Sequence, residues 1–207
     1  MGYIWIAQQK TKLPLRFLHL RNPNPLSYNL SERQSHLRMY LAPERITGLV
    51  SPTYVGIRQT GMSFLLETKM EFAPASMYEE AGLVLLQSNE FHYRLVVTIR
   101  EDKNVLLLIK CYEGNEEVLA QMPVEEATDD DNSLRLRVVA EGQDLKFAVS
   151  YDGKSYQVIK AGVDGRMLST DVASGFVGNT LGLYCSSNLT ETDNYADFDW
   201  LIYRNMD

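Results

Sequence analysis

The sequence predicts an all-β protein built from two antiparallel sheets, and three observations lead to this prediction. Short apolar runs alternate with polar residues at a period of two along most of the chain, as in strands with one buried and one solvated face. Gly, Asn, Asp or Pro residues bound these runs, which is typical of turns between strands. The runs recur at roughly 8–12 residues, the spacing of a sandwich or barrel.

The alternation is clearest in residues 37–41, 134–138 and 145–149, where Leu, Met, Val or Phe occupies every second position. A strand places such side chains on one face, so each run is expected to be half-buried. Further strands are expected at residues 64–72, 83–87, 93–100, 105–112, 117–122 and 195–203.

Residues 76–86 carry two conflicting signals. Met77, Glu79 and Glu80 favour a helix, but Gly82 interrupts the pattern and a continuous apolar run follows at residues 83–86. Such a run is typical of a buried strand. We therefore expect a loop that leads into a strand.

Two turns fix the pairing of the later strands. Glu141-Gly142-Gln143-Asp144 separates the runs at residues 134–138 and 145–149, and Tyr151-Asp152-Gly153-Lys154 follows the second run. Glycine supplies the positive φ that tight hairpin turns need. Adjacent antiparallel hairpins are expected here.

Nothing in the sequence divides the chain into separate units, since it has no internal repeat, low-complexity tract or Pro/Gly/Ser-rich linker. We expect one β-sandwich domain over residues 13–207, preceded by an N-terminal lead-in or linker remnant at residues 1–12. The acidic run at residues 125–131 is expected to be a solvated loop tip. Calcium binding there is an alternative, although the acidic spacing does not match an EF-hand loop.

Composition excludes several classes of function. The formal charge is 20 − 27 = −7, so the chain offers no basic surface for nucleic acid. Its 45% hydrophobic content can form a substantial core, but the longest apolar run, at residues 105–109, is too short to span a membrane. The N-terminus lacks the pattern of a signal peptide. We expect a soluble cytoplasmic or periplasmic protein, with Cys111 and Cys185 as ordinary buried thiols.

No catalytic motif stands out. The chain has three histidines and lacks GxSxG, HExxH and P-loop patterns. A sandwich glycosidase would need two carboxylates on one face, as a Glu-x-Asp-x-Glu strand supplies. Glu191-Thr192-Asp193 begins such a run but is followed by Asn194 and Tyr195. We therefore expect no catalytic carboxylates in this chain. The 12 tyrosines suit a sugar-stacking platform, but tyrosine is also a favoured strand residue.

Several strings, taken in order, resemble the C-terminal domain of glycoside hydrolase family 43 β-xylosidases. The resemblance runs from about residue 15 to residue 203. The strings are Leu20-Arg21-Asn22-Pro23, Ser35-His36-Leu37-Arg38-Met39, Pro52-Thr53-Tyr54-Val55-Gly56-Ile57-Arg58-Gln59, Glu79-Glu80-Ala81-Gly82-Leu83 with Phe91-His92-Tyr93, Leu168-Ser169-Thr170 with Gly175-Phe176-Val177-Gly178, and Ala196-Asp197-Phe198-Asp199-Trp200.

The resemblance implies a concanavalin A-like jelly-roll β-sandwich that packs on a five-bladed catalytic propeller. The propeller would carry the acid and base, and this chain would carry no catalytic residues. The resemblance also places Phe176 on a loop that closes the propeller's sugar pocket, with Gly175 and Gly178 permitting a sharp turn. Such a ring can stack on a sugar and exclude water. A core aromatic on a strand is the alternative for Phe176.

The resemblance suggests roles for four further residues. Arg58, Gln59 and His92 are candidates for the domain interface or a sugar contact. For Arg58 and Gln59 the alternative is that they only follow a buried strand, and for His92 it is an ordinary half-exposed strand position. Asp199 is a candidate ligand for a structural calcium, and pairing with an arginine is its alternative. Asp197 and Asp199 are expected on one face of the last strand, with Phe198 and Trp200 on the other.

The expected function is that of an accessory β-sandwich domain in a β-xylosidase or α-L-arabinofuranosidase-like enzyme. The implied partners are the catalytic propeller and xylo- or arabino-oligosaccharides, with no required cofactor apart from the calcium considered above. Two alternatives remain open: a stand-alone carbohydrate-binding module for xylan or a related polysaccharide, and a complete jelly-roll glycosidase. A homo-oligomer is also left open.

Overall fold

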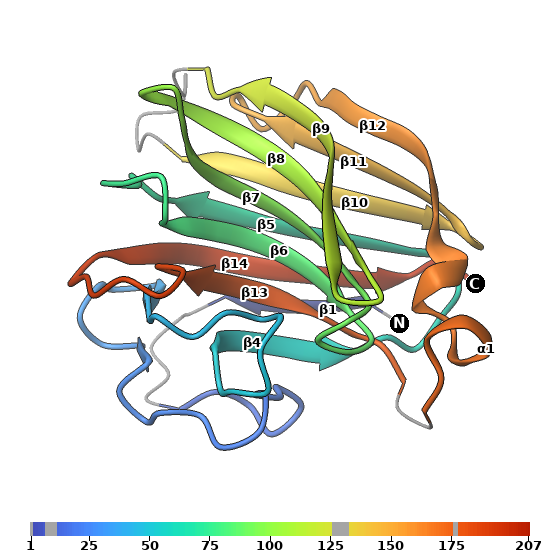
Figure 1. The fold of residues 1–207 in the computed structure, drawn as a ribbon, viewed down its shortest axis with the longest axis horizontal. Coiled ribbons are helices and arrows are strands. Elements are labelled where there is room, and N and C mark those ends of the chain that lie inside the picture. The colour runs from blue at the N-terminus through green and yellow to red at the C-terminus, as the bar shows by residue number, and fades with distance from the viewer. Residues whose placement is uncertain (1, 7–11, 126–132, 176–177) are drawn as a thin grey trace.

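Two antiparallel sheets lie face to face in this protein (Figure 1), whose computed structural model describes residues 2–6, 12–125, 133–175 and 178–207. One sheet has eight strands and the other six, so the predicted all-β sandwich is confirmed. The larger sheet runs, in spatial order, β12 (Gln157–Asp164), β11 (Asp144–Ser150), β10 (Leu134–Glu141), β5 (Phe64–Glu71), β14 (Tyr195–Asn205), β3 (Leu37–Tyr40) and β2 (Tyr28–Asn29), with β1 (Gly2–Ile6) paired to β14.

The smaller sheet has β4 at one edge and β9 at the other. Its spatial order is β4 (Thr53–Arg58), β13 (Thr180–Ser186), β6 (Glu80–Leu86), β7 (His92–Arg100), β8 (Lys103–Tyr112) and β9 (Asn115–Pro123). Two single-turn helices, η1 (Gly165–Leu168, 3-10) and α1 (Thr170–Ala173), connect β12 to β13. Both predicted hairpins are present, since β10 pairs with β11 and β11 with β12.

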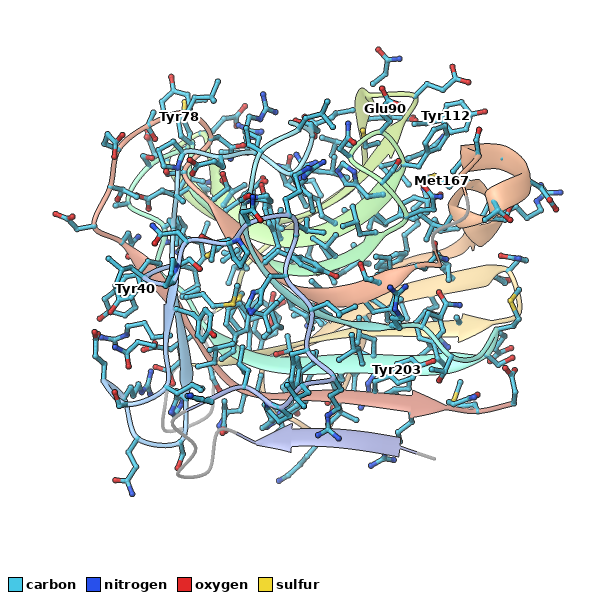
Figure 2. All side chains as sticks on the ribbon, turned by 90° about the horizontal axis from the view of Figure 1, so that it is seen from below. Tyr40, Tyr78, Glu90, Tyr112, Met167 and Tyr203 are labelled. Carbon is cyan, nitrogen blue, oxygen red and sulfur yellow. The ribbon has the colours of Figure 1, made fainter. Side chains whose placement is uncertain are left out.

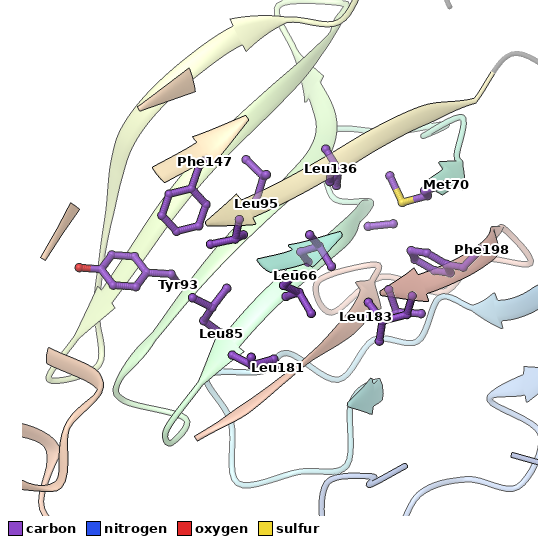
Figure 3. Close-up of a cluster of buried hydrophobic side chains, with 14 of the residues drawn as sticks. Leu66, Met70, Leu85, Tyr93, Leu95, Leu136, Phe147, Leu181, Leu183 and Phe198 are labelled. Carbon is purple, nitrogen blue, oxygen red and sulfur yellow. The ribbon is translucent and has the colours of Figure 1, made fainter. Parts of the chain in front are cut away.

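The main core lies between the two sheets (Figure 3). Leu66, Leu136 and Phe147 project from the larger sheet toward Leu85 and Leu95 of the smaller one, and all five side chains are buried. Burying a side chain of this kind stabilises a fold by about 1.5–3 kcal/mol. Because only one face of these strands packs in the core, their sequences alternate between apolar and polar residues.

The smaller sheet is buried on its outer face as well. A second apolar cluster lies there, which includes Val84, Val96 and Leu107 of the sheet and Ile46 from the segment before β4. Residues 105–109 are therefore apolar at every position: Leu106 and Leu108 face the main core, while Val105, Leu107 and Ile109 face the second cluster. Continuous apolar runs are typical of strands covered on both faces.

Residues 76–86 form the predicted loop and strand. A hydrogen bond from the Glu79 amide to the Ser76 carbonyl, at 3.2 Å, closes a turn, and β6 begins at Glu80. No helix forms because every residue of β6 is buried between neighbouring strands.

Residues 1–12 were expected to be a lead-in, but they include a strand. β1 pairs antiparallel with β14, from Gly2 opposite Arg204 to Ile6 opposite Trp200. The alternating pattern needed to predict this strand is absent from Gly2–Ile6, which is apolar at four of its five positions.

The expected face of Trp200 was wrong. The pairing of β14 with β5 passes from Phe198 opposite Met70 directly to Trp200 opposite Lys69, with a register shift between them. One extra residue in a strand shifts the alternation, so that each later side chain points to the opposite face from the one expected. Phe198 therefore lies in the core, whereas Trp200 lies on the outer face near the Arg135 guanidinium, 5.9 Å from its ring.

Within the described residues, no helix is long and apolar enough to cross a membrane. The predicted acidic loop tip at residues 125–131 lies, from residue 126 onward, outside the described residues.

A substitution at Gly82 tests how closely β6 and β7 approach each other. A Cβ atom at this position would lie 2.0 Å from the main-chain oxygen of Leu95 on β7. Gly82→Ala is expected to lower the free energy of unfolding by about 3 kcal/mol, because backbone rather than a flexible side chain must move. Urea denaturation of both proteins measures this difference.

Gly178→Ala is the matched control, since no atom of the described residues beyond its chain neighbours lies within 4 Å of its added Cβ. Its free energy of unfolding should stay within about 0.5 kcal/mol of the wild type. Equal stability of the two variants would contradict the close approach described here.

Candidate functional site

Arg58 and Gln59 lie where β4 ends, next to the start of β13. The Gln59 amide donates to the Asn179 carbonyl at 3.0 Å, and the Asn179 Nδ2 donates back to Gln59 Oε1 at 3.2 Å. The Gln59 side chain also donates to the Gly61 carbonyl at 2.8 Å. Gln59 thus holds the chain in place just after the Gly175–Gly178 segment, while Arg58 is exposed.

The other side of that segment is anchored to β6. Gln87 Nε2, just past the end of β6, donates to the Ser174 carbonyl at 2.9 Å. Gly175 has a φ of +78°, a conformation that residues with a Cβ rarely adopt. Phe176, the predicted pocket-closing residue, lies outside the described residues, but residues on both sides of it are fixed by hydrogen bonds.

A small apolar recess of about 330 Å³ lies beside Arg58. Leu15, Leu18 and Ile57 line it together with Thr60, and the Leu15 side chain is fully exposed. Leu18 is fixed by two hydrogen bonds to Gly56 of β4, at 2.7 and 3.0 Å. We call residues 15–18, 57–60, 174–175 and 178–179 the β4-edge surface.

Further exposed apolar side chains lie on the segment that borders β4. Leu26, Leu49 and Val50 are all exposed, and the Arg21 guanidinium donates to the Val50 carbonyl at 2.6 Å, which joins the two loops. In Figure 1 this blue segment runs past the outer edge of β4.

His92 is not at the surface, so the structure contradicts a direct interface or sugar contact by this residue. Its side chain has no exposed area, on the outer face of the smaller sheet. Nε2 lies 3.2 Å from Arg94 Nη1 and must be the acceptor, because a guanidinium only donates. Burial, with the nearby Arg94 charge, lowers the pKa of His92 to about 4, so the ring is neutral. The continuous burial of β7 was not evident from its mixed sequence.

Asp199 does not have the surroundings of a calcium site. Its carboxylate lies 3.6 Å from Lys69 Nζ, a cation that would repel Ca²⁺. Calcium needs six to eight oxygens, and no group of three or more His, Cys, Asp or Glu side chains suited to a metal occurs among the described residues. The residues around Asp199 therefore do not fit a calcium ion. Its partner is a lysine, whereas the alternative expected an arginine.

The carboxylate that pairs with arginines is Asp197. It accepts from Arg38 Nε and Nη2 and from Arg33 Nη1, each at 2.9 Å. Burial alone would raise the pKa of Asp197, but the two guanidiniums outweigh it and hold the pKa below its usual range. The Arg38 guanidinium also stacks on the Tyr195 ring at 3.7 Å. This cluster joins β3, β14 and the loop before β3.

Sequence reasoning missed the role of Glu79, which is buried. Its two carboxylate oxygens accept from the Ala75 amide at 2.6 Å, from Thr192 Oγ1 at 2.7 Å and from Asn194 Nδ2 at 2.7 Å. These contacts join the loop before β6 to the loop between β13 and β14. Glu79 stands within a string quoted for the resemblance, but two of its three partners, Thr192 and Asn194, lie more than 100 residues away.

The sequence analysis also did not predict the row of polar side chains on the outer face of β7. His92, Arg94 and Thr98 alternate with apolar residues of the main core, and all three are buried. The signal was present in the sequence, because a strand with a polar face predicts solvent or polar partners there.

A two-sheet sandwich with a loop-bearing edge beside β4 defines the class as a concanavalin A-like β-sandwich domain. Residues 9–204 match the family described as the beta xylosidase C-terminal Concanavalin A-like domain. The chain belongs to this family, which confirms the resemblance found in its sequence.

The relatives carry glycosidase names. A xylosidase/arabinosidase of Butyrivibrio fibrisolvens is 33% identical over 193 residues, 93% of this chain and 36% of the relative. A non-reducing end alpha-L-arabinofuranosidase of Bacteroides ovatus is 27% identical over 214 residues, 100% of this chain and 39% of the relative. A crystal structure of a xylan beta-1,4-xylosidase from Bacillus halodurans superposes with a TM-score of 0.88 at 27% identity, covering 98% of this chain and 39% of that one. The chain thus spans little more than a third of these relatives.

The buried His92 makes stability depend on pH. In the unfolded chain His92 takes up a proton near its ordinary pKa of 6.5, whereas in the fold it does so only near 4. The unfolded state therefore binds more protons between these values, so stability falls as the pH falls from 6.5 to 4. The loss is on the order of 3 kcal/mol. His92→Gln, which cannot titrate, should remove this part of the slope.

Urea unfolding of both proteins at several pH values from 7 to 4 measures the slope. An NMR titration of the His92 ring in the folded wild type checks its cause. Identical slopes, or a ring that titrates near pH 6.5, would show that burial does not suppress its protonation.

Proposed function

We propose that this chain is the accessory β-sandwich of a family 43 glycoside hydrolase, docking on a catalytic domain through the β4-edge surface. The proposed reaction of the assembled enzyme is inverting hydrolysis of terminal xylose or arabinose. The observation that carries the proposal is the position of the anchored segment around Phe176 beside an exposed apolar recess. Membership of the family and the names of the relatives support it.

The recess is suited to a protein partner. Leu15 is fully exposed and lies next to Leu18 and Ile57. Covering its side chain with a partner would stabilise the complex by about 1.5–3 kcal/mol. Arg58, at the rim, supplies a planar donor for a carboxylate or carbonyl of that partner. Gln59 is committed to Asn179 and Gly61, so we assign it to holding the loop rather than to direct contact.

Phe176 is proposed to reach the sugar pocket of the catalytic domain. The hydrogen bonds of Gln87 to Ser174 and of Gln59 to Asn179 fix both ends of its segment. An aromatic ring presented there can stack on the C–H face of a pentose and exclude water, without transferring a proton.

The pKa values of two carboxylates, Asp197 and Glu116, support a non-catalytic role. A general acid needs a raised pKa, but the pKa of Asp197 is held down by its two arginines. Glu116 is similar: burial would raise its pKa, and the Arg94 and Arg45 guanidiniums outweigh it and lower it. Proton transfer is therefore assigned to the catalytic domain.

A chimera tests the docking surface. In it, this chain replaces the matched segment of the Butyrivibrio fibrisolvens relative, and hydrolysis of p-nitrophenyl xyloside and arabinoside is measured. Leu15→Asp should lower kcat/KM at least about tenfold, because it puts a charge where an apolar contact forms. Val158→Asp, at an exposed valine of the edge strand β12, is the matched control and should have no effect. Equal activity of the two variants would exclude the β4-edge surface as the interface.

Phe176→Ala in the same chimera tests pocket closure. Loss of one aromatic stacking contact predicts a fall in kcat/KM of about tenfold, with the variant's melting temperature unchanged. The isolated chain should be inactive. Hydrolysis by the isolated chain, or full activity of the Phe176 variant, would refute this part of the proposal.

A further inference from the structure

A second recess, of about 390 Å³, lies on the outer face of the smaller sheet, and the proposed function does not use it. Its lining comes from β6, β7, β8 and β9 and from three loops, and it shares no residue with the β4-edge surface. We call it the outer-face recess. Its size falls within the range of small-molecule sites.

The floor of the outer-face recess is charged and buried. Arg94 and Glu80 are both less than a tenth exposed, and the Arg94 Nε lies 3.1 Å from Glu80 Oε1. These two atoms form an ion pair without a hydrogen bond, since their geometry does not align. Both atoms are fully covered by protein, so this pair is a fixed, charged floor. The charged atoms that a ligand can reach belong to the more exposed Arg45 and Glu116 side chains, which are 38% and 27% exposed.

Glu116 extends this floor toward the solvent. Its carboxylate contacts the Arg94 guanidinium on one side and Arg45 Nη2 on the other, at 2.9 Å. The lining of the recess therefore has three guanidiniums, of Arg45, Arg94 and Arg100, and three carboxylates, of Glu80, Glu116 and Glu117. The charges balance, so neither an anion nor a cation is favoured.

The rim is apolar and held in place. Tyr78 is 50% exposed and Leu189 is 75% exposed, and both line the recess. Figure 2 shows Tyr78 at the periphery of the molecule. The Asn188 side chain donates to the Tyr78 carbonyl at 2.6 Å, and Glu79 joins the two loops from below. An aromatic rim on fixed loops loses little entropy when a ligand stacks on it.

A neutral saccharide matches this combination. Each sugar hydroxyl both donates and accepts, so adjacent hydroxyls can bind a guanidinium and a carboxylate together. The C–H face of the ring suits Tyr78 and Leu189. An anionic or cationic ligand would be repelled by one half of the floor.

We propose that the outer-face recess is a binding site for a neutral oligosaccharide, separate from the sugar pocket of the catalytic partner. The choice of a xylo-oligosaccharide rests on the proposed function, whereas the site itself rests on the recess. In the assembled enzyme such a site would hold the polysaccharide near the catalytic domain and raise the local substrate concentration.

Titration of the isotope-labelled 207-residue chain with xylohexaose, followed by NMR, tests the proposal. Resonances of residues lining the recess should shift with a Kd of about 1 mM. Tyr78→Ala should weaken binding at least about fivefold. Tyr112→Ala is the matched control: this tyrosine is 38% exposed on β8 and does not line the recess. It should leave the Kd unchanged.

Three results would overturn the proposal. They are the absence of shifts at about 20 mM sugar, equal Kd values for the Tyr78 and Tyr112 variants, and tighter binding of an anionic galacturonic acid oligomer. Each variant's melting temperature shows whether it is folded, and Glu80→Gln probes the floor independently. Leu15→Asp should not alter sugar binding, so failure of this site and failure of docking give different results.

Discussion

The structure depends on burial of the smaller sheet on both of its faces. The larger sheet covers one face with the main core, and the segment before β4 contributes Ile46 and Leu20 to the cluster on the other. The Ile46 amide also donates to the Tyr184 hydroxyl at 3.3 Å, which fixes the covering segment to β13. A sheet covered only by another sheet would leave Val84, Val96 and Leu107 in water. The long segment before β4 is therefore part of the hydrophobic core.

This constraint also explains where both candidate surfaces lie. The segment that covers the outer face of the sheet continues past β4, where it presents Leu15 and Leu18. The cover does not extend over the whole face, and beyond its limit lies the recess with Arg94 and Glu80. Polar residues under or beside such a cover must find partners, and Arg94 does so with Glu80 and Glu116. The β4-edge surface and the outer-face recess therefore both lie where the covering segment ends.

The sequence predicted the strands better than their surroundings. Alternation and hairpin turns are local signals, and they placed β3, β5, β10, β11 and β14 correctly. The face of Trp200 depended on a bulge that no local pattern marks. The burial of His92 depended on neighbours such as Glu116 of β9, and the partner of Asp199 on a neighbouring strand. The Gln59–Asn179 contact joins residues 120 apart, so the sequence could suggest Gln59 but not its role. Where a side chain's environment comes from distant segments, pattern alone is insufficient.

The two hydrogen bonds between Leu18 and Gly56 have a consequence for how a partner can bind. A free edge strand invites addition of a further strand from another molecule, which leads to β-augmentation or to aggregation. On β4 the amide and carbonyl of Gly56 are already occupied by this short bridge, so the chain supplies its own edge cap. A partner approaching this edge must recognise side-chain shape and charge instead of main-chain hydrogen bonds. Binding at this edge therefore depends on the partner's side chains and not on the non-specific strand pairing that an uncapped sheet edge allows.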